Sequence, residues 1–136
     1  MPQAIRDFSV RTGQSTPEHK GELVRCIFES LALRFKTVLD QIHTMTKRNI
    51  EALYIVGGGS QNELLNQFTA DACAIRVSAG PVEATAVGNV LVQAIAKGKI
   101  QSIQKGRELV ARSFPVRTYQ PQDSIRWNDA LHERLP

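Results

Sequence analysis

The chain has 136 residues, of which 42% are hydrophobic and 22% are charged, a composition typical of one globular domain. Its 17 basic and 13 acidic residues give a net charge of +4, and residues 97–136 carry the whole excess, with eight basic and four acidic side chains. No basic run is interleaved with aromatic residues, so the sequence does not favour nucleic-acid binding.

A long amphipathic helix is predicted to end at about residue 47. Its apolar residues recur at spacings of three and four from Leu23 to Met45. Ser15 or Thr16 suits its N-cap, and Glu18 stands where a capping box with Ser15 would need it. The preceding residues 1–15 show a mixture of apolar and polar residues, with a turn at 12–14.

Two short buried strands are predicted on either side of a second helix. The first is the apolar run Leu53–Val56, which three glycines follow, and the second is Ile75–Val77, which ends before Ala79-Gly80-Pro81. The segment Ser60-Gln61-Asn62-Glu63 has the spacing of a capping box, so the helix between the strands is expected to begin at Ser60.

A third, strongly apolar helix is predicted over Glu83–Lys97, closed by Gly98. It is apolar nearly all round, which predicts burial on more than one side, and Ala84 and Gly88 lie on one face, where another backbone could come close. The remaining predicted elements are a helix over Ser102–Ser113, a strand over Val116–Tyr119 and a helix over Ser124–Leu135. This order indicates a layered α/β domain.

The three glycines Gly57, Gly58 and Gly59 are open to two interpretations, a tight turn or a ligand contact. A dinucleotide-binding fingerprint needs a third glycine where Asn62 stands, and no Gly-Lys-Ser/Thr follows to make a phosphate-binding P-loop. A capping box of Ser60 and Glu63 would occupy backbone donors and place a carboxylate nearby. The helix start therefore favours a flat, weakly charged group such as adenosine over a terminal phosphate.

The stretch "YIVGGGSQNELLNQFTADACAIRVSAGPVEATAVGN" resembles the C-terminal signature of the FGGY carbohydrate kinases. The segments "MPQAI", "TGQ", "GELVRCIFESLAL" and "VGNVLVQAIAKGKI" agree as well, so the resemblance covers about residues 1–121. It implies the C-terminal half of an actin/hexokinase-like (ribonuclease H-like) ATPase fold, in which ATP and sugar bind in the cleft between two domains.

The resemblance also implies an activity and a site. Within the family, the similarity is greatest to kinases that transfer the γ-phosphate of ATP, with Mg²⁺, to the 1-hydroxyl of L-rhamnulose. The family pattern places Gly58 and Asn62 against the adenosine, with Gly57 and Gly59 supporting the loop. The segment 81–88 resembles a small-residue helix near the interdomain hinge.

The family's catalytic base, sugar-binding residues and Asp-x-Gly phosphate loop are expected upstream of residue 1, and the chain contains no Asp-x-Gly. We therefore predict that residues 1–136 form the nucleotide side of a kinase, that they lack the N-terminal domain and that they are inactive alone. Two alternatives remain, a family kinase for another ketose and a non-catalytic interaction module.

No metal site is predicted, because the histidines, His19, His43 and His132, have no Cys or carboxylate at ligand spacing and are expected on helix surfaces. Cys26 and Cys73 are expected to be buried, reduced thiols. Ser9 and Thr69 stand where some family members have cysteines, so no disulfide is expected. No targeting or membrane segment is recognised, which predicts a cytoplasmic protein. Trp127 is expected to pack the last helix onto the domain.

Overall fold

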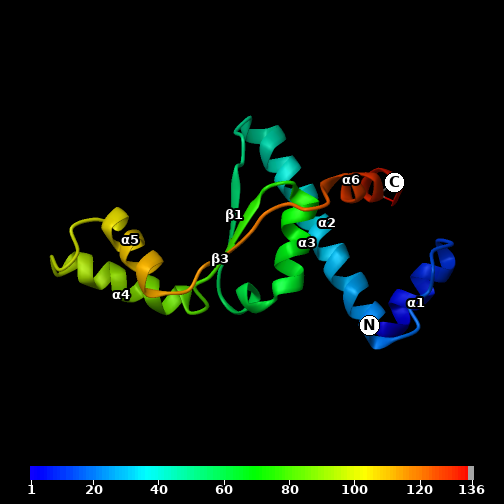
Figure 1. The fold of residues 1–136 in the computed structure, drawn as a ribbon, viewed down its shortest axis with the longest axis horizontal. Coiled ribbons are helices and arrows are strands. Elements are labelled where there is room, and N and C mark those ends of the chain that lie inside the picture. Colours follow the sequence, from blue (N-terminus) through cyan, green and yellow to red (C-terminus); the bar gives the residue numbers. More distant parts are fainter. Residues whose placement is uncertain (135–136) are drawn as a thin grey trace.

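The computed structural model describes the backbone of residues 1–134 and the side chains of residues 1–130 (Figure 1). Short strands separate groups of one or two helices in this part of the chain. In order they are α1 (Pro2–Arg11), α2 (Lys20–Thr46), β1 (Ala52–Ile55), the 3-10 turn η1 (Gly58–Gln61), α3 (Glu63–Cys73), β2 (Arg76–Ala79), α4 (Ala84–Ala96), α5 (Ile103–Ser113), β3 (Arg117–Tyr119) and α6 (Ser124–Arg134). The predicted end of the last helix at Leu135 lies outside the described residues.

The three strands form one mixed sheet in the order β1-β2-β3. β1 and β2 are parallel, with Ile55 opposite Ala79, and β2 and β3 are antiparallel, with Val77 opposite Tyr119. Parallel neighbours need a crossover connection, which η1 and α3 supply here. The loops that follow β1 and β2 therefore lie together at one end of the sheet, beyond the carboxyl ends of both strands.

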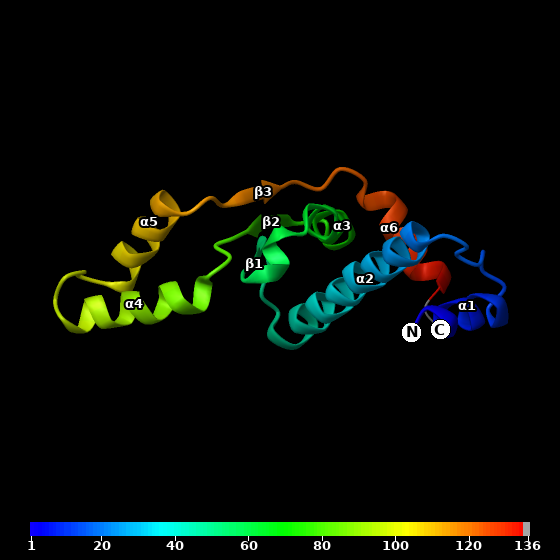
Figure 2. The same cartoon turned by 90° about the horizontal axis from the view of Figure 1, so that it is seen from below.

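The core lies where α3 packs against α2 and the sheet (Figure 2). Small side chains permit the close approach of the two helices, since Ala32 of α2 and Ala70 of α3 are fully buried. Val77 of β2 is also fully buried. The core side of α3 carries polar residues too, and among them Asn66 and Thr69 have no solvent exposure.

The C-terminal part of the chain is tied across α3. The Asp71 carboxylate oxygen Oδ1 accepts hydrogen bonds from Gln67 Nε2 at 2.9 Å and from the backbone N–H of Gln122 at 2.7 Å. Gln67 Nε2 also donates to the Gln120 carbonyl at 2.9 Å. The ring centroids of Phe68 and Trp127 lie 5.3 Å apart. These contacts confirm the prediction that Trp127 packs the last helix onto the domain.

The predicted start of the long helix is wrong. α2 begins at Lys20 with His19 as its N-cap, and the carboxylate of Glu22 accepts the backbone N–H groups of Glu18 and His19 at 2.7 and 3.2 Å. These bonds hold the pKa of Glu22 below its ordinary value. Arg6 donates to the carbonyls of Pro17 and Glu18 at 3.0 and 3.1 Å, so the segment expected to begin the helix is held outside it. Arg6 belongs to α1, a helix that the sequence analysis did not predict.

The expected burial of α4 is also wrong. None of its residues is buried, and Val90 and Val92 are 66% and 64% exposed. α4 packs against α5, where a Cβ on the buried Gly106 would lie 3.4 Å from Leu91 Cδ2, and the two helices project away from the sheet (Figures 1 and 2). A Cβ on Gly88 would meet nothing within 4 Å, so no described part of this chain uses the close approach expected there. Among residues 1–134, no helix is both long and apolar enough to cross a membrane.

Cys73 is buried, as predicted, whereas Cys26 is only half-buried, and both are free thiols. Burial raises the pKa of Cys73 to about 11, although Lys36 acts in the opposite direction. Because the thiolate is the reactive form, the raised pKa and the burial of Cys73 should make its thiol react slowly near pH 8. We expect Ellman's reagent to label one thiol quickly in the folded chain and both in denaturant. In the variant Cys26→Ser the fast phase should disappear, and equal labelling rates for the two thiols would contradict this assignment.

Candidate functional site

The glycine-rich segment directly follows β1 and turns sharply into η1. Gly57 has φ +78° and ψ −164°, a conformation that residues with a side chain rarely adopt. Its N–H donates to the Pro81 carbonyl at 3.1 Å. Its carbonyl accepts both the N–H and the hydroxyl of Ser60, at 3.0 and 2.7 Å. The turn itself therefore requires glycine at position 57.

The turn does not require glycine at positions 58 and 59. A Cβ on Gly59 would lie 3.9 Å from Ile55 Cγ2, an ordinary contact, and a Cβ on Gly58 would meet nothing within 4 Å. Neither residue has a positive φ. The backbone of Gly58 consequently faces open space, where a flat group could lie directly against it.

The predicted capping box of Ser60 and Glu63 is wrong. Because η1 intervenes, α3 begins at Glu63, and its N-cap is Asn62, whose Oδ1 accepts the N–H of Leu65 at 3.0 Å. Ser60 bonds to Gly57 instead, and Glu63 forms an ion pair with Arg117. A capping box therefore does not disfavour a phosphate here. Asn62 nevertheless occupies one backbone donor at the start of α3, and the Glu63 carboxylate in the first turn is paired with Arg117.

A second loop, Gly80-Pro81 after β2, lies beside the glycine-rich segment and forms a wall next to Gly58. Gly80, with φ +121°, donates its N–H to the Ile55 carbonyl at 2.8 Å. The next residue, Pro81, accepts the N–H of Gly57. Parallel sheets bind ligands beyond the carboxyl ends of their strands, and the structure brings the predicted residues Gly57, Gly58, Gly59 and Asn62 to that edge. From the sequence, Ala79-Gly80-Pro81 was expected to end a strand and Pro81 to begin a hinge segment, and the hydrogen bonds of Gly80 and Pro81 to the loop after β1 were not predicted.

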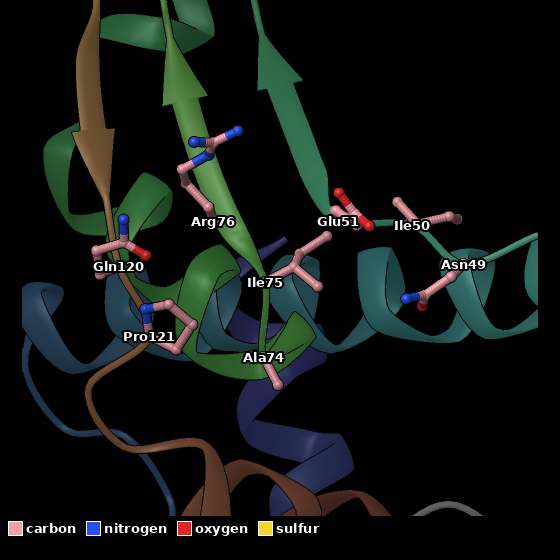
Figure 3. A pocket seen from close by; sticks show the side chains of 8 residues that line it. All are labelled: Asn49, Ile50, Glu51, Ala74, Ile75, Arg76, Gln120 and Pro121. Atoms are coloured by element: carbon pink, nitrogen blue, oxygen red, sulfur yellow. The ribbon is translucent and has the colours of Figure 1, made fainter.

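A shallow pocket lies at the opposite ends of β1 and β2, near their first residues (Figure 3). It is open to solvent and includes none of the predicted site residues. Its lining consists of Asn49, Ile50, Glu51, Ala74, Ile75, Arg76, Gln120 and Pro121. The pocket and the glycine-rich segment are therefore separate features of the sheet.

Among residues 1–130, whose side chains the structure describes, no group of three or more His, Cys, Asp or Glu side chains could hold a metal ion. His19 is the N-cap of α2, and His43 Nδ1 lies 2.9 Å from the Arg48 carbonyl. The side chain of His132 lies outside the described part of the chain.

Residues 1–97 match the C-terminal domain of the FGGY family of carbohydrate kinases. The chain belongs to this family. Among its members, rhamnulokinases are strongly similar: that of Bacteroides thetaiotaomicron is 52% identical over 130 residues, which cover 96% of this chain and 27% of the relative. The rhamnulokinase of Bacillus subtilis is 40% identical over 126 residues, covering 93% and 26%, and that of Enterococcus faecalis is 47% identical over 128 residues, covering 91% and 26%.

A solved structure shows the same fold. The xylulose kinase of Rhodospirillum rubrum superposes with a TM-score of 0.63 and 23% sequence identity, over 89% of this chain and 24% of that one. Together with the family match, this confirms the predicted fold class, an α/β domain of the actin/hexokinase-like type. The chain spans about a quarter of the length of the relatives that it matches.

Proposed function

We propose that this chain forms the adenosine-binding side of a kinase that phosphorylates L-rhamnulose to L-rhamnulose 1-phosphate in L-rhamnose catabolism. The observation that carries the proposal is the bare backbone of Gly58, which faces open space beyond the carboxyl ends of two parallel strands. The similarity to rhamnulokinases supports the choice of substrates, ATP and L-rhamnulose.

The residues around Gly58 suit a nucleoside better than a phosphate. Asn62 uses Oδ1 for the helix cap, which leaves its Nδ2 as a donor toward a purine nitrogen. The N–H of Leu65 is already bonded to Asn62 Oδ1, so one of the backbone donors that a phosphate would use at the start of α3 is occupied. The triphosphate is therefore assigned to groups outside this segment.

We assign the general base and the Mg²⁺ site to an N-terminal kinase domain. A carboxylate base is needed to take the proton of the attacking hydroxyl, and Mg²⁺ neutralises charge on the phosphoryl group in transfer. The 136 residues contain no Asp-x-Gly loop, and their described carboxylates form no cation site. The matched relatives are about four times as long and have room for such a domain.

Two exposed apolar features support a partner domain of this kind. The outer edge of β1 is unpaired among the described strands, and Tyr54 and the adjoining Val56 are 68% and 53% exposed. One face of α2 also carries an apolar stripe that is more than a third exposed. The stripe consists of Leu31, Phe35, Val38 and Ile42. We propose that the N-terminal domain covers both features.

Calorimetry with the 136-residue chain tests the proposal. ADP and adenosine are expected to bind with similar, about millimolar, affinity, and tripolyphosphate is expected neither to bind nor to compete, because the site contacts the nucleoside. An L-rhamnulose assay with ATP and Mg²⁺ should show no turnover. Absence of ADP binding would favour the non-catalytic module, and turnover by this chain alone would contradict the assignment of the catalytic base.

The alternative of a kinase for another ketose concerns residues that the proposal places in the other domain. We expect the longer kinase that is proposed to contain these residues to phosphorylate L-rhamnulose faster than other ketoses. Equal or faster turnover of another ketose would show that the sugar assignment is wrong.

A further inference from the structure

The buried side chain of Asn66 connects α3 to the glycine-rich segment. Asn66 lies one helical turn after the N-cap Asn62 and has no solvent exposure. Its Nδ2 donates to the Ser60 carbonyl at 2.9 Å. Its Oδ1 is also buried and has no hydrogen-bond partner among the described residues. Asn66 therefore makes a contact outside its own helix and leaves one polar atom unsatisfied.

An unsatisfied buried oxygen lowers the free energy of unfolding, and an apolar residue of similar volume would avoid that loss. Stability of α3 alone thus does not explain an amide at position 66. The contact that only the amide supplies is the bond to Ser60. That residue in turn holds Gly57, through its N–H and its hydroxyl.

These bonds fix both sides of η1. The Gly57 carbonyl is held by Ser60, the Ser60 carbonyl is held by Asn66, and the N–H of Asn62 bonds to the Gly59 carbonyl at 3.2 Å. Gly58 lies within this chain of contacts and has no side chain with which to anchor itself. A 3-10 turn of four residues has little stability of its own, so its geometry depends on such external bonds.

We propose that Asn66 is a positioning residue, which holds η1 so that the Gly58 backbone and the Asn62 amide are arranged for adenosine before the nucleotide arrives. This role rests on the proposed function of the segment. Pre-arrangement of a loop increases affinity because less conformational freedom is lost on binding.

The test compares Asn66→Leu and Asn66→Ser with the control Thr69→Val. Leucine cannot donate a hydrogen bond, and serine is too short to reach the Ser60 carbonyl. Thr69 is equally buried on the same helix, but its hydroxyl bonds within α3, to the Leu65 carbonyl at 2.7 Å. Each variant is examined by amide hydrogen exchange, by ADP calorimetry and by its thermal unfolding midpoint.

Both Asn66 variants are expected to exchange the Ser60 and Asn62 amides at least tenfold faster, with the Gly80 amide unchanged. Their Kd for ADP should rise at least tenfold, at a temperature where the unfolding midpoint shows them folded. Thr69→Val should leave the exchange rates and the Kd within twofold of the original chain. The serine variant decides the outcome if leucine prevents folding.

Unchanged exchange at Ser60 and Asn62, or a Kd no higher than that of Thr69→Val, would overturn the positioning role while the proposed function stands. If the original chain binds no ADP, the proposed function fails. The positioning role for adenosine then fails with it, and the exchange rates report only whether Asn66 orders the turn.

Discussion

Gly58→Val is expected to remove the heat of ADP binding while the free energy of unfolding changes by less than about 1 kcal/mol. A Cβ at this position meets nothing within 4 Å, and Gly58 does not have the positive φ that would exclude valine. The fold therefore tolerates the side chain. A nucleoside lying against the backbone does not, because the branched side chain would fill its place.

Two further glycine variants separate binding from folding. Gly21→Val, at an open position in the first turn of α2, makes the same chemical change away from the site and should leave ADP binding unchanged. Gly57→Ala should lower the free energy of unfolding by about 1–3 kcal/mol, because φ +78° with ψ −164° is a conformation that residues with a side chain rarely adopt. If Gly58→Val binds ADP as the original chain does, the assignment of Gly58 to the adenosine site is wrong.

The parts of the fold that could be predicted from sequence are those set by local patterns. The apolar run at Leu53–Val56, followed by glycine, gives β1 within one residue, and the helix predicted over Ser102–Ser113 matches α5, which begins one residue later with Ser102 as its N-cap. In each case the residues that determine the element are neighbours in the chain. Their physical preferences act before any tertiary contact forms.

The parts that failed depend on contacts between distant residues. Arg6 reaches across 11 and 12 residues to the carbonyls of Pro17 and Glu18, and no local pattern announces that bond. At the candidate site, the sequence allows either Ser60 or Asn62 as the N-cap of α3. In the structure Asn62 is the N-cap, because Ser60 is held in the turn after Gly57 and accepts a hydrogen bond from Asn66. These two contacts exist only in the folded chain.

The apolar character of α4 illustrates a different limit. Its sequence predicts burial, yet Val90 and Val92 are mostly exposed. The apolar residues of a helix are normally buried, either against the same domain or against another part of an assembly. The pattern of α4 is thus consistent with the proposed partner domain, since α5 packs against α4 but leaves all of its residues at least partly exposed.

Gly80→Ala is expected to lower the free energy of unfolding by about 3 kcal/mol or more, because a clash adds to backbone strain. Its φ is +121°, and a Cβ would lie only 2.7 Å from the Pro115 carbonyl oxygen, a backbone atom that cannot rotate away. Relief of the clash must move the chain before β3 or the end of β2. The N–H of Gly80 also bonds to Ile55, so the shift would reach β1.

Urea unfolding measures this loss, and Gly98→Ala is its control. Gly98 also has a positive φ, +68°, but a Cβ there meets nothing within 4 Å, so only the strain of about 1–2 kcal/mol applies. The additional decrease in the free energy of unfolding of Gly80→Ala, relative to Gly98→Ala, measures the clash with Pro115. Equal losses in the two variants would mean that the β3 segment moves aside at no cost. The clash with the Pro115 carbonyl would then not be the cause of the loss.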